Sequence, residues 1–189
     1  MKIAILGAES TGKSQLAAEL TSALRVQGKT VSRVDEYLRE WCDAHGRTPR
    51  NDEQAHIARE QARRVQAAMA QPAITARTAP SSSSSTAAQS TATCIVIADT
   101  TSLMTAVYSE LLFNDTSLHD FAAAKQRGYD ITLVTGLDLP WVADGLQRDG
   151  PHSREATDSL LRAALVALRW ITRWCMAQVP RGWQMRCKP

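Results

Sequence analysis

Residues 7 to 14 form a phosphate-binding pattern, G-x-x-x-x-G-K-[ST], which reads Gly7-Ala8-Glu9-Ser10-Thr11-Gly12-Lys13-Ser14. The apolar run at 2–6 predicts a buried strand before it, and apolar residues at helical spacing over 15–26 predict a helix after it. Backbone N–H groups of such a loop and the helix N-terminus point at one spot, where they favour phosphate. In that setting Lys13 reaches the β- and γ-phosphates of ATP, and the Ser14 hydroxyl binds Mg²⁺. An incidental glycine turn would not explain the flanking pattern.

A single acid, Asp99, follows the clearest internal apolar run, residues 94–98. An acid at the end of a buried strand beside a phosphate loop holds Mg²⁺ directly or through water. The alternative is an aspartate that caps the next helix. We therefore expect Asp99 and Ser14 to be the metal-binding residues.

Two further acids, Asp35 and Glu36, stand at the end of the second expected strand, residues 30–34. Either acid could bind a substrate hydroxyl and accept its proton during phosphoryl transfer. Acids are also common at an exposed helix start, and the sequence does not choose between the two residues. Arg39 lies one helical turn further on, where it could bind a phosphate or pair with Asp35.

Arginine and aromatic side chains supply further candidates. Arg148 and Arg154 flank a glycine- and proline-containing segment that could close over the transferring phosphate, or form an ordinary polar loop. Tyr37, Trp41 and Trp141 could stack on a flat substrate ring, although each taken singly also suits packing.

The elements that must position these residues alternate along the chain. Strands are predicted at 2–6, 30–34, 94–98 and 129–134, and helices at 15–26, 36–44, 51–70, 102–113, 117–127 and 154–176. Alternation of this kind implies parallel strands, whose carboxyl ends share one rim of the sheet. The fold class is α/β, a P-loop NTPase three-layer sandwich with a mainly parallel sheet. We expect one domain over 1–176, interrupted by a serine-rich low-complexity connector at 72–93. The tail, 177–189, is atypical, and no strand pattern is visible from 174 onwards.

Bulk composition excludes several classes of protein. The chain has 189 residues, 44% hydrophobic and 22% charged, with a formal net charge of +3. These values are typical of a globular domain, and the mild charge needs no nucleic-acid partner. There is no apolar stretch long enough to span a membrane and no signal peptide, so a cytoplasmic protein without a membrane partner is expected. The four cysteines form no C-x-x-C pair, which is typical of reduced thiols.

Several segments together resemble the kinase domain of NadR-like proteins, the ribosylnicotinamide kinase group of AAA-type P-loop ATPases. The resemblance extends over about residues 1–170. The segments that carry it are the phosphate loop, Asp35-Glu36-Tyr37-Leu38-Arg39-Glu40, Asn51-Asp52-Glu53-Gln54, Asp99-Thr100-Thr101, and Leu139-Pro140-Trp141-Val142-Ala143-Asp144-Gly145-Leu146-Gln147-Arg148.

The resemblance implies a nucleoside-kinase-like fold and transfer of phosphate from ATP, with Mg²⁺, to the ribose 5′-hydroxyl of nicotinamide riboside in NAD salvage. By position it implies that residues 7–14 bind ATP and Asp99 lies by Mg²⁺. Glu36 and Arg39 would face the riboside, and Arg148 and Arg154 would belong to a lid. The chain has neither the His-x-Gly-His signature of a nucleotidyltransferase nor a helix-turn-helix, so adenylylation and repression are not implied.

Two rival functions remain at this point. One is a regulatory protein that binds and slowly hydrolyses ATP without a small-molecule acceptor, and the other is an inactive binding module. The acids at 35 and 36, the aromatic side chains and the lid arginines favour a kinase, because a switch needs no acceptor pocket. The sequence does not indicate an oligomeric state.

Overall fold

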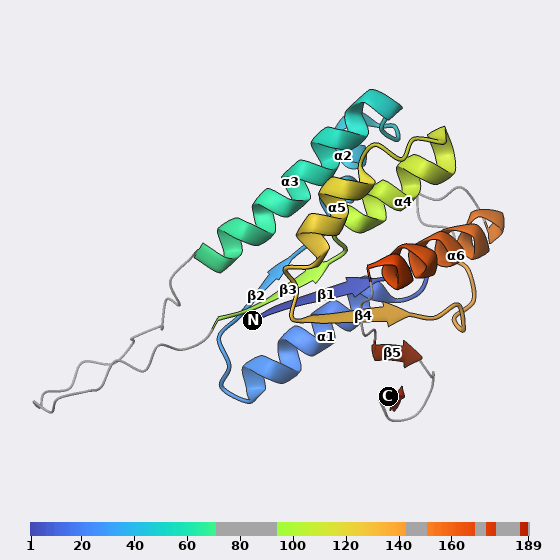
Figure 1. Ribbon diagram of the computed structural model, residues 1–189. Helices are drawn as coiled ribbons and strands as arrows, with labels where there is room; N and C mark the ends of the chain where they lie inside the picture. The colour runs from blue at the N-terminus through green and yellow to red at the C-terminus, as the bar shows by residue number, and fades with distance from the viewer. Residues whose placement is uncertain (71–93, 143–150, 169–172, 177–185, 189) are drawn as a thin grey trace, which may run out of the picture.

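The structure is a computed structural model that describes residues 1–70, 94–142, 151–168, 173–176 and 186–188 (Figure 1). The side chains of residues 151, 152 and 173–188 are not described. The order of elements is β1 (Lys2–Leu6), α1 (Lys13–Val26), β2 (Val31–Val34), α2 (Tyr37–His45), α3 (Asn51–Ala70), β3 (Ile95–Asp99), α4 (Ser102–Phe113), α5 (His119–Gln126), β4 (Ile131–Thr135), α6 (Pro151–Ala167), β5 (Arg173–Met176) and β6 (Arg186–Lys188).

The described strands form one sheet in the order β2-β3-β1-β4-β5-β6. The first five strands in that order pair in parallel, and β6 is antiparallel to β5. The strand β1 lies between β3 and β4, so Ile5 is in register with both Asp99 and Leu133. This arrangement brings the end of β1, where the phosphate loop starts, beside the end of β3.

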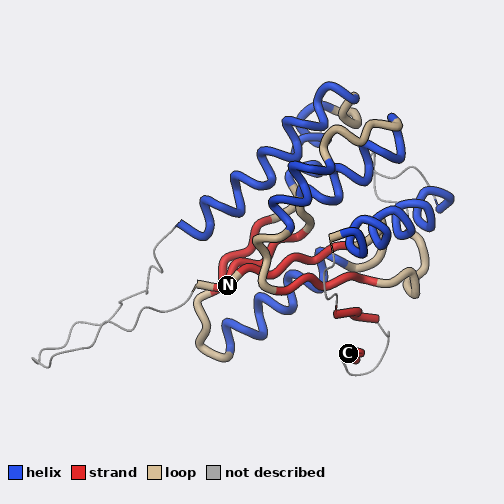
Figure 2. Tube along the Cα trace, in the orientation of Figure 1, coloured by secondary structure: helices blue, strands red, loops and turns tan. Residues whose placement is uncertain are grey.

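Helices cover both faces of the sheet, which explains why the strands are apolar on both sides (Figures 1 and 2). On one face α1 packs Leu16 and Ala17 against alternate strand residues such as Ile3 and Ile5. The opposite residues of the same strands pack against α3, α4, α5 and α6, and Leu161 of α6 is fully buried there. The three layers confirm the predicted sandwich with its mainly parallel sheet.

Most predicted elements are confirmed to within two residues at each end, but the C-terminal prediction was wrong. A helix was expected over 154–176, whereas α6 ends at Ala167 and Arg173–Met176 forms the strand β5. The segment pairs with the edge of β4, Val134 with Trp174, so sheet pairing prevails over a local helical pattern. The tail was expected to lack strands, yet Arg186–Lys188 forms β6. The 72–93 connector lies outside the described residues.

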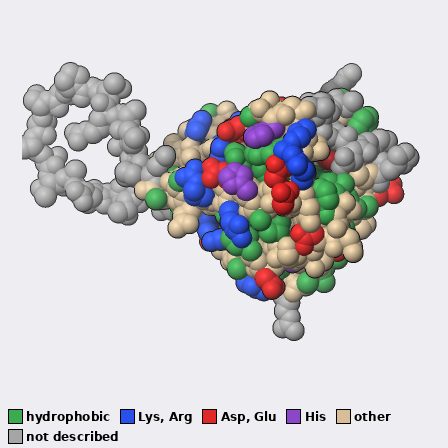
Figure 3. Space-filling model, turned by 90° about the horizontal axis from the view of Figure 1, so that it is seen from above, with side chains coloured by type: hydrophobic (Ala, Val, Ile, Leu, Met, Phe, Trp, Pro, Cys, Tyr) green, Lys and Arg blue, Asp and Glu red, His purple; other side chains and the backbone are tan. Residues whose placement is uncertain are grey.

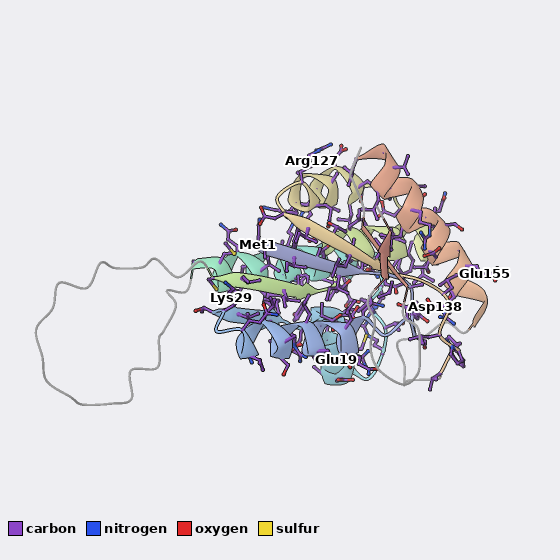
Figure 4. The ribbon with its side chains drawn as sticks, turned by 90° about the horizontal axis from the view of Figure 1, so that it is seen from below. Met1, Glu19, Lys29, Arg127, Asp138 and Glu155 are labelled. Carbon is purple, nitrogen blue, oxygen red and sulfur yellow. The ribbon has the colours of Figure 1, made fainter. Side chains whose placement is uncertain are left out.

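Figure 4 shows which residues lie at each end of the sheet. Met1, Lys29 and Arg127 lie towards the amino ends of the strands, whereas Asp138 and Glu155 lie towards the carboxyl ends.

The face seen from above in Figure 3 carries acidic, basic and histidine side chains intermingled with one another. Arg64 of α3 forms an ion pair with Glu60 one turn earlier in the same helix and another with Glu40 of α2.

Candidate active site

The phosphate loop joins the end of β1 to the start of α1. Gly12 caps α1 with a φ of 78°, a left-handed conformation that favours glycine. A Cβ atom on Gly12 would come within 3.1 Å of Leu139 Cδ1, so the segment after β4 lies close over the loop. The N-terminus of α1, with its positive dipole end, therefore lies at this point.

Lys13 is held inside the loop in this structure. Its Nζ donates a hydrogen bond to the carbonyl oxygen of Ala8 at 2.7 Å. The Thr11 hydroxyl donates to the same carbonyl, also at 2.7 Å. The lysine that would contact the phosphates thus starts from a defined position beside the loop.

A cleft of about 670 Å³ opens in front of the loop, and we call it the loop cleft. It brings together candidates that are far apart in sequence. Its lining consists of Ser10, Thr11, Gly12, Lys13, Ser14, Gln15, Arg33, Asp35, Glu36, Arg39, Glu40, Asp43 and Asp99. The helix α1, the end of β2, the start of α2 and the end of β3 all contribute to it, as expected for a parallel sheet.

Asp99 fits the role of a metal-binding acid. The residue is only 3% exposed, and its Oδ1 atom has no hydrogen-bond partner among the described residues. Ser14 lines the same loop cleft. Among those residues no group of three or more His, Cys, Asp or Glu side chains could hold a metal ion. Mg²⁺ usually takes one or two protein ligands together with phosphate oxygens and water, so Ser14 and Asp99 are a donor set suited to it.

Asp35 and Glu36 differ in their surroundings. Asp35 forms an ion pair with Arg33, with 2.7 Å between Arg33 Nε and Asp35 Oδ1. It lines the loop cleft, whereas Glu36 lines both this cleft and a second, smaller cavity to which Asp35 does not contribute. The ion pair and the two cavities therefore distinguish two neighbouring acids that the sequence alone treated as equivalent.

The second cavity, which we call the side cavity, lies against α2, α3 and α4. It is lined by Glu9, Ser10, Lys13, Glu36, Leu38, Arg39, Cys42, Thr48, Pro49, Gln54, Tyr108 and Leu112. It shares Ser10, Lys13, Glu36 and Arg39 with the loop cleft. Burial raises the pKa of the Cys42 thiol to about 11, and the neighbouring acids Asp43 and Glu36 add to the effect. Cys42 therefore lines the cavity as an uncharged thiol at neutral pH.

Arg154 of α6 reaches back to the phosphate loop. The residue is 8% exposed, and its Nη2 donates to the carbonyl oxygen of Leu139 at 2.8 Å, with Ser10 O at 3.5 Å. The Ser10 hydroxyl in turn donates to the carbonyl of Val142 at 2.9 Å. Arg154 thus lies near the loop, and its membership of a lid stays a prediction. Arg148 lies outside the described residues.

The aromatic candidates contact other parts of the protein. Tyr37 packs under Arg64, whose guanidinium carbon is 4.3 Å from the ring centroid. Trp41 is 6% exposed and stacks on His45 at 3.9 Å. Neither of them lines the loop cleft or the side cavity, and Trp141 does not either.

Comparison with known sequences matches residues 2–182 to the family described as AAA domain. The chain belongs to this family. Among curated proteins, none is similar enough in sequence to count as a relative. In the part of this AAA-domain chain that the structure describes, no helix is long and apolar enough to cross a membrane.

Solved structures share its fold. Two structures of NadR protein, one in complex with NR and one with NAD and AMP-PNP, each have a TM-score of 0.65 and 18% sequence identity. They cover 93% and 94% of this chain, which spans only 43% and 44% of theirs. Deoxyadenosine kinase from M. mycoides has a TM-score of 0.53 and 13% identity, over 94% of this chain and 90% of that one. At these identities the likeness shows a shared fold and nothing beyond it.

Several site residues of this AAA-domain chain were missed in the sequence. Tyr108 lines the side cavity and belongs to no sequence pattern with a chemical meaning of its own. Gln54 lines it too, and although it belongs to a segment that carries the resemblance, no role was predicted for it. Gln61 could have been found in the sequence, because it is a polar residue between Ile57 and Val65 in the apolar stripe of α3. In the structure it is 2% exposed. Thr135 ends β4 as Asp99 ends β3, so the strand-end rule that selected Asp99 could have selected it as well.

Proposed function

We propose that this protein transfers the γ-phosphoryl group of ATP to a hydroxyl of a nucleoside-like small molecule, with nicotinamide riboside as the acceptor and nicotinamide mononucleotide as the product. The observation that carries the proposal is the shared wall of the two cavities. Lys13, Glu36 and Arg39 face both the loop cleft and the side cavity. A donor phosphate in one cavity and an acceptor hydroxyl in the other would therefore meet at these residues, as in-line transfer requires.

Each residue has a defined task in this reaction. The phosphate loop and Lys13 bind the phosphates and draw negative charge towards α1. Ser14 and Asp99 would hold Mg²⁺, which neutralises charge on the phosphate oxygens. Glu36 binds the acceptor hydroxyl and takes its proton as the oxygen attacks phosphorus. Arg39 lines both cavities and would supply positive charge to the transferring group. Arg154 lines neither of them and would reach that group only after leaving the Leu139 carbonyl.

The lining of the side cavity supports a nucleoside-like acceptor. Glu36, Arg39 and Gln54 supply charged and amide groups for ribose hydroxyls, while Leu38, Leu112 and the Tyr108 ring supply apolar surface for a flat base. The cavity measures only about 70 Å³. A nucleoside needs more room, so acceptor binding requires the wall to move, and Leu112, which is 46% exposed, borders open solvent. The NadR structure in complex with NR is the reason for naming nicotinamide riboside first.

The test measures ADP release and product mass with ATP and Mg²⁺, using nicotinamide riboside, adenosine and uridine as acceptors. We expect riboside-dependent ADP release and a product heavier by one phosphoryl group. The Glu36→Gln variant should lower kcat/KM for the riboside by about a hundredfold or more, because it loses the base, while ATP affinity changes little. Asp35→Asn should have the smaller effect, since Asp35 is paired with Arg33 and does not face the side cavity.

Glu19→Gln on α1, away from both cavities, is the matched control and should behave as the wild type. ATP hydrolysis that no acceptor stimulates would contradict the proposal and favour a regulatory ATPase. Phosphorylation of another nucleoside in preference to the riboside would support the assignment as a kinase and rule out nicotinamide riboside as the acceptor.

A further inference from the structure

The hydroxyl of Thr135 lies in the wall behind the phosphate loop. Thr135 is the last residue of β4 and is 2% exposed. Its Oγ1 is 2.6 Å from Thr11 Oγ1 and 3.2 Å from the carbonyl oxygen of Leu6, the residue that precedes the loop. A strand that contributes no residue to the phosphate-binding pattern therefore contacts that loop from behind.

The direction of these hydrogen bonds follows because each threonine hydroxyl has only one proton to donate. A carbonyl oxygen can only accept, so the Thr11 hydroxyl must donate its proton to Ala8 O at 2.7 Å. Thr11 Oγ1 then has only lone pairs left, and the Thr135 hydroxyl must donate to it across the 2.6 Å contact. The chain runs from Thr135 to Thr11 to the Ala8 carbonyl, the same carbonyl that accepts from Lys13 Nζ.

The Thr135 side chain also fills the space behind the loop beside Gly7. A Cβ atom on Gly7 would be 2.0 Å from Thr135 Oγ1 and 3.0 Å from Thr11 Oγ1. Real atoms do not approach so closely, so the two hydroxyls occupy the place that a side chain at position 7 would need. The absence of a side chain at Gly7 and the hydroxyl at Thr135 are two parts of one arrangement.

We propose that Thr135 is a positioning residue for the phosphate loop: through Thr11 its hydroxyl fixes the Ala8 peptide, and with it the curvature of the loop that receives the nucleotide. Thr135 lines neither the loop cleft nor the side cavity. The expected effect on ATP affinity rests on the proposed function, whereas the expected effect on the conformation of the loop does not.

Thr132 provides a matched control on the same strand. It is also 2% exposed, but its hydroxyl accepts from Gln126 Nε2 at 2.9 Å, at the end of α5 and away from the loop. Serine and alanine are compared at each position, because serine keeps the hydroxyl, alanine removes it, and both remove the methyl group. The Ser-to-Ala difference at position 135 therefore isolates the hydrogen bond from packing.

The experiment measures MgATP affinity by titration calorimetry and hydrogen exchange of a peptide containing residues 7–14 without nucleotide. Thr135→Ala should bind MgATP roughly tenfold more weakly than Thr135→Ser and exchange faster in the loop, which is the size expected for one buried hydrogen bond. Thr132→Ala and Thr132→Ser should differ from each other in neither measurement, even where both lower the melting temperature.

Equal loop exchange in Thr135→Ala and Thr135→Ser would overturn the proposal, as would equal losses at positions 132 and 135. If the wild type binds no MgATP, the proposed function fails, yet the exchange rates still decide the role of Thr135. If Thr135→Ala does not fold, Thr135→Val, which keeps the shape of the side chain and removes the hydroxyl, is compared with the wild type, with the same expected and overturning results.

Discussion

The side-chain oxygen of Gln61 accepts a hydrogen bond from the backbone N–H of Tyr37, at 2.8 Å. Gln61 lies in the middle of α3, and Tyr37 is the first residue of α2. The Gln61 Nε2 atom also makes longer contacts of 3.4 Å with the carbonyl oxygens of Asp35 and Thr100. One buried amide therefore connects the backbone on both sides of Glu36 with the backbone that follows Asp99.

Replacing Gln61 by leucine should lower both stability and acceptor turnover. The variant leaves the N–H of Tyr37 buried without its partner, which costs about 1–3 kcal/mol and lowers the melting temperature by several degrees. Because Glu36 is then less firmly placed, KM for the acceptor should rise more than KM for ATP. Calorimetry and steady-state kinetics measure the two effects. Gln66→Leu is the control, on the exposed side of the same helix, and a KM for the acceptor unchanged in Gln61→Leu would contradict the expectation.

The Lys13→Ala variant should lose phosphoryl transfer by at least about a hundredfold while keeping its fold. The side chain donates to the Ala8 carbonyl, and that carbonyl keeps its hydrogen bond from Thr11 in the variant. Circular dichroism and the ADP-release assay check the two parts. Lys29→Ala, at the other end of the sheet, should retain full activity, and unchanged turnover in Lys13→Ala would rule out the loop as the phosphate site.

Substitution of Arg154 should separate charge from shape. Arg154→Lys keeps a cation but loses the planar fork that reaches the Leu139 carbonyl, and Arg154→Met loses both. We expect kcat to fall in the order wild type, lysine, methionine, with a loss of about a hundredfold for methionine if the guanidinium also meets the transferring phosphate. Arg162→Met on the same helix, where Arg162 pairs with Asp158 at 2.9 Å, should leave kcat unchanged. Equal kcat for the wild type and Arg154→Met would remove Arg154 from the reaction.

Acid should weaken the ion pairs of α3. The hydrogen bonds from Arg63, followed by those from Arg64, lower the pKa of Glu60 from 4.5 to about 2, although partial burial acts in the opposite direction. The folded state thus has the lower pKa, so the contribution is complete above about pH 4.5 and disappears as the pH falls to about 2. Urea unfolding of the wild type and Glu60→Gln should differ by on the order of 1 kcal/mol at pH 7, and the difference should shrink below about pH 4.5 and vanish near pH 2.

An Arg63→Met background is the control for that experiment, because it removes the largest cause of the shift. The loss of stability caused by Glu60→Gln should be smaller in that background. A loss that stays constant from pH 7 to pH 3 would show that Glu60 contributes through packing instead of charge.

The sequence predicted the parts of the fold that rest on local patterns. The phosphate loop, the strand that ends at Asp99 and the long helix α3 each have a periodicity or a spacing that physical chemistry interprets directly. Alternation of strands and helices then placed the loop, Asp35, Glu36 and Asp99 at one rim, and the loop cleft agrees with this. These inferences needed no knowledge of distant contacts.

Other features depend on contacts between distant segments. The strand β5 exists because β4 offers an open edge for Trp174 and its neighbours, which a window of local sequence does not contain. Thr135 and Thr11 are 124 positions apart, and nothing near either residue indicates that their hydroxyls are 2.6 Å apart.

The position of Met1 has a practical consequence for attaching the protein to a surface. Its amino group donates to the Cys94 carbonyl at 3.0 Å, next to the start of β3. The five residues of β1 carry the chain about 17 Å from there to the phosphate loop. A tag added before Met1 keeps one N–H for that hydrogen bond and leaves from the opposite end of the sheet. A sensor chip that captures the protein through such a tag would thus present both cavities to the flowing ligand.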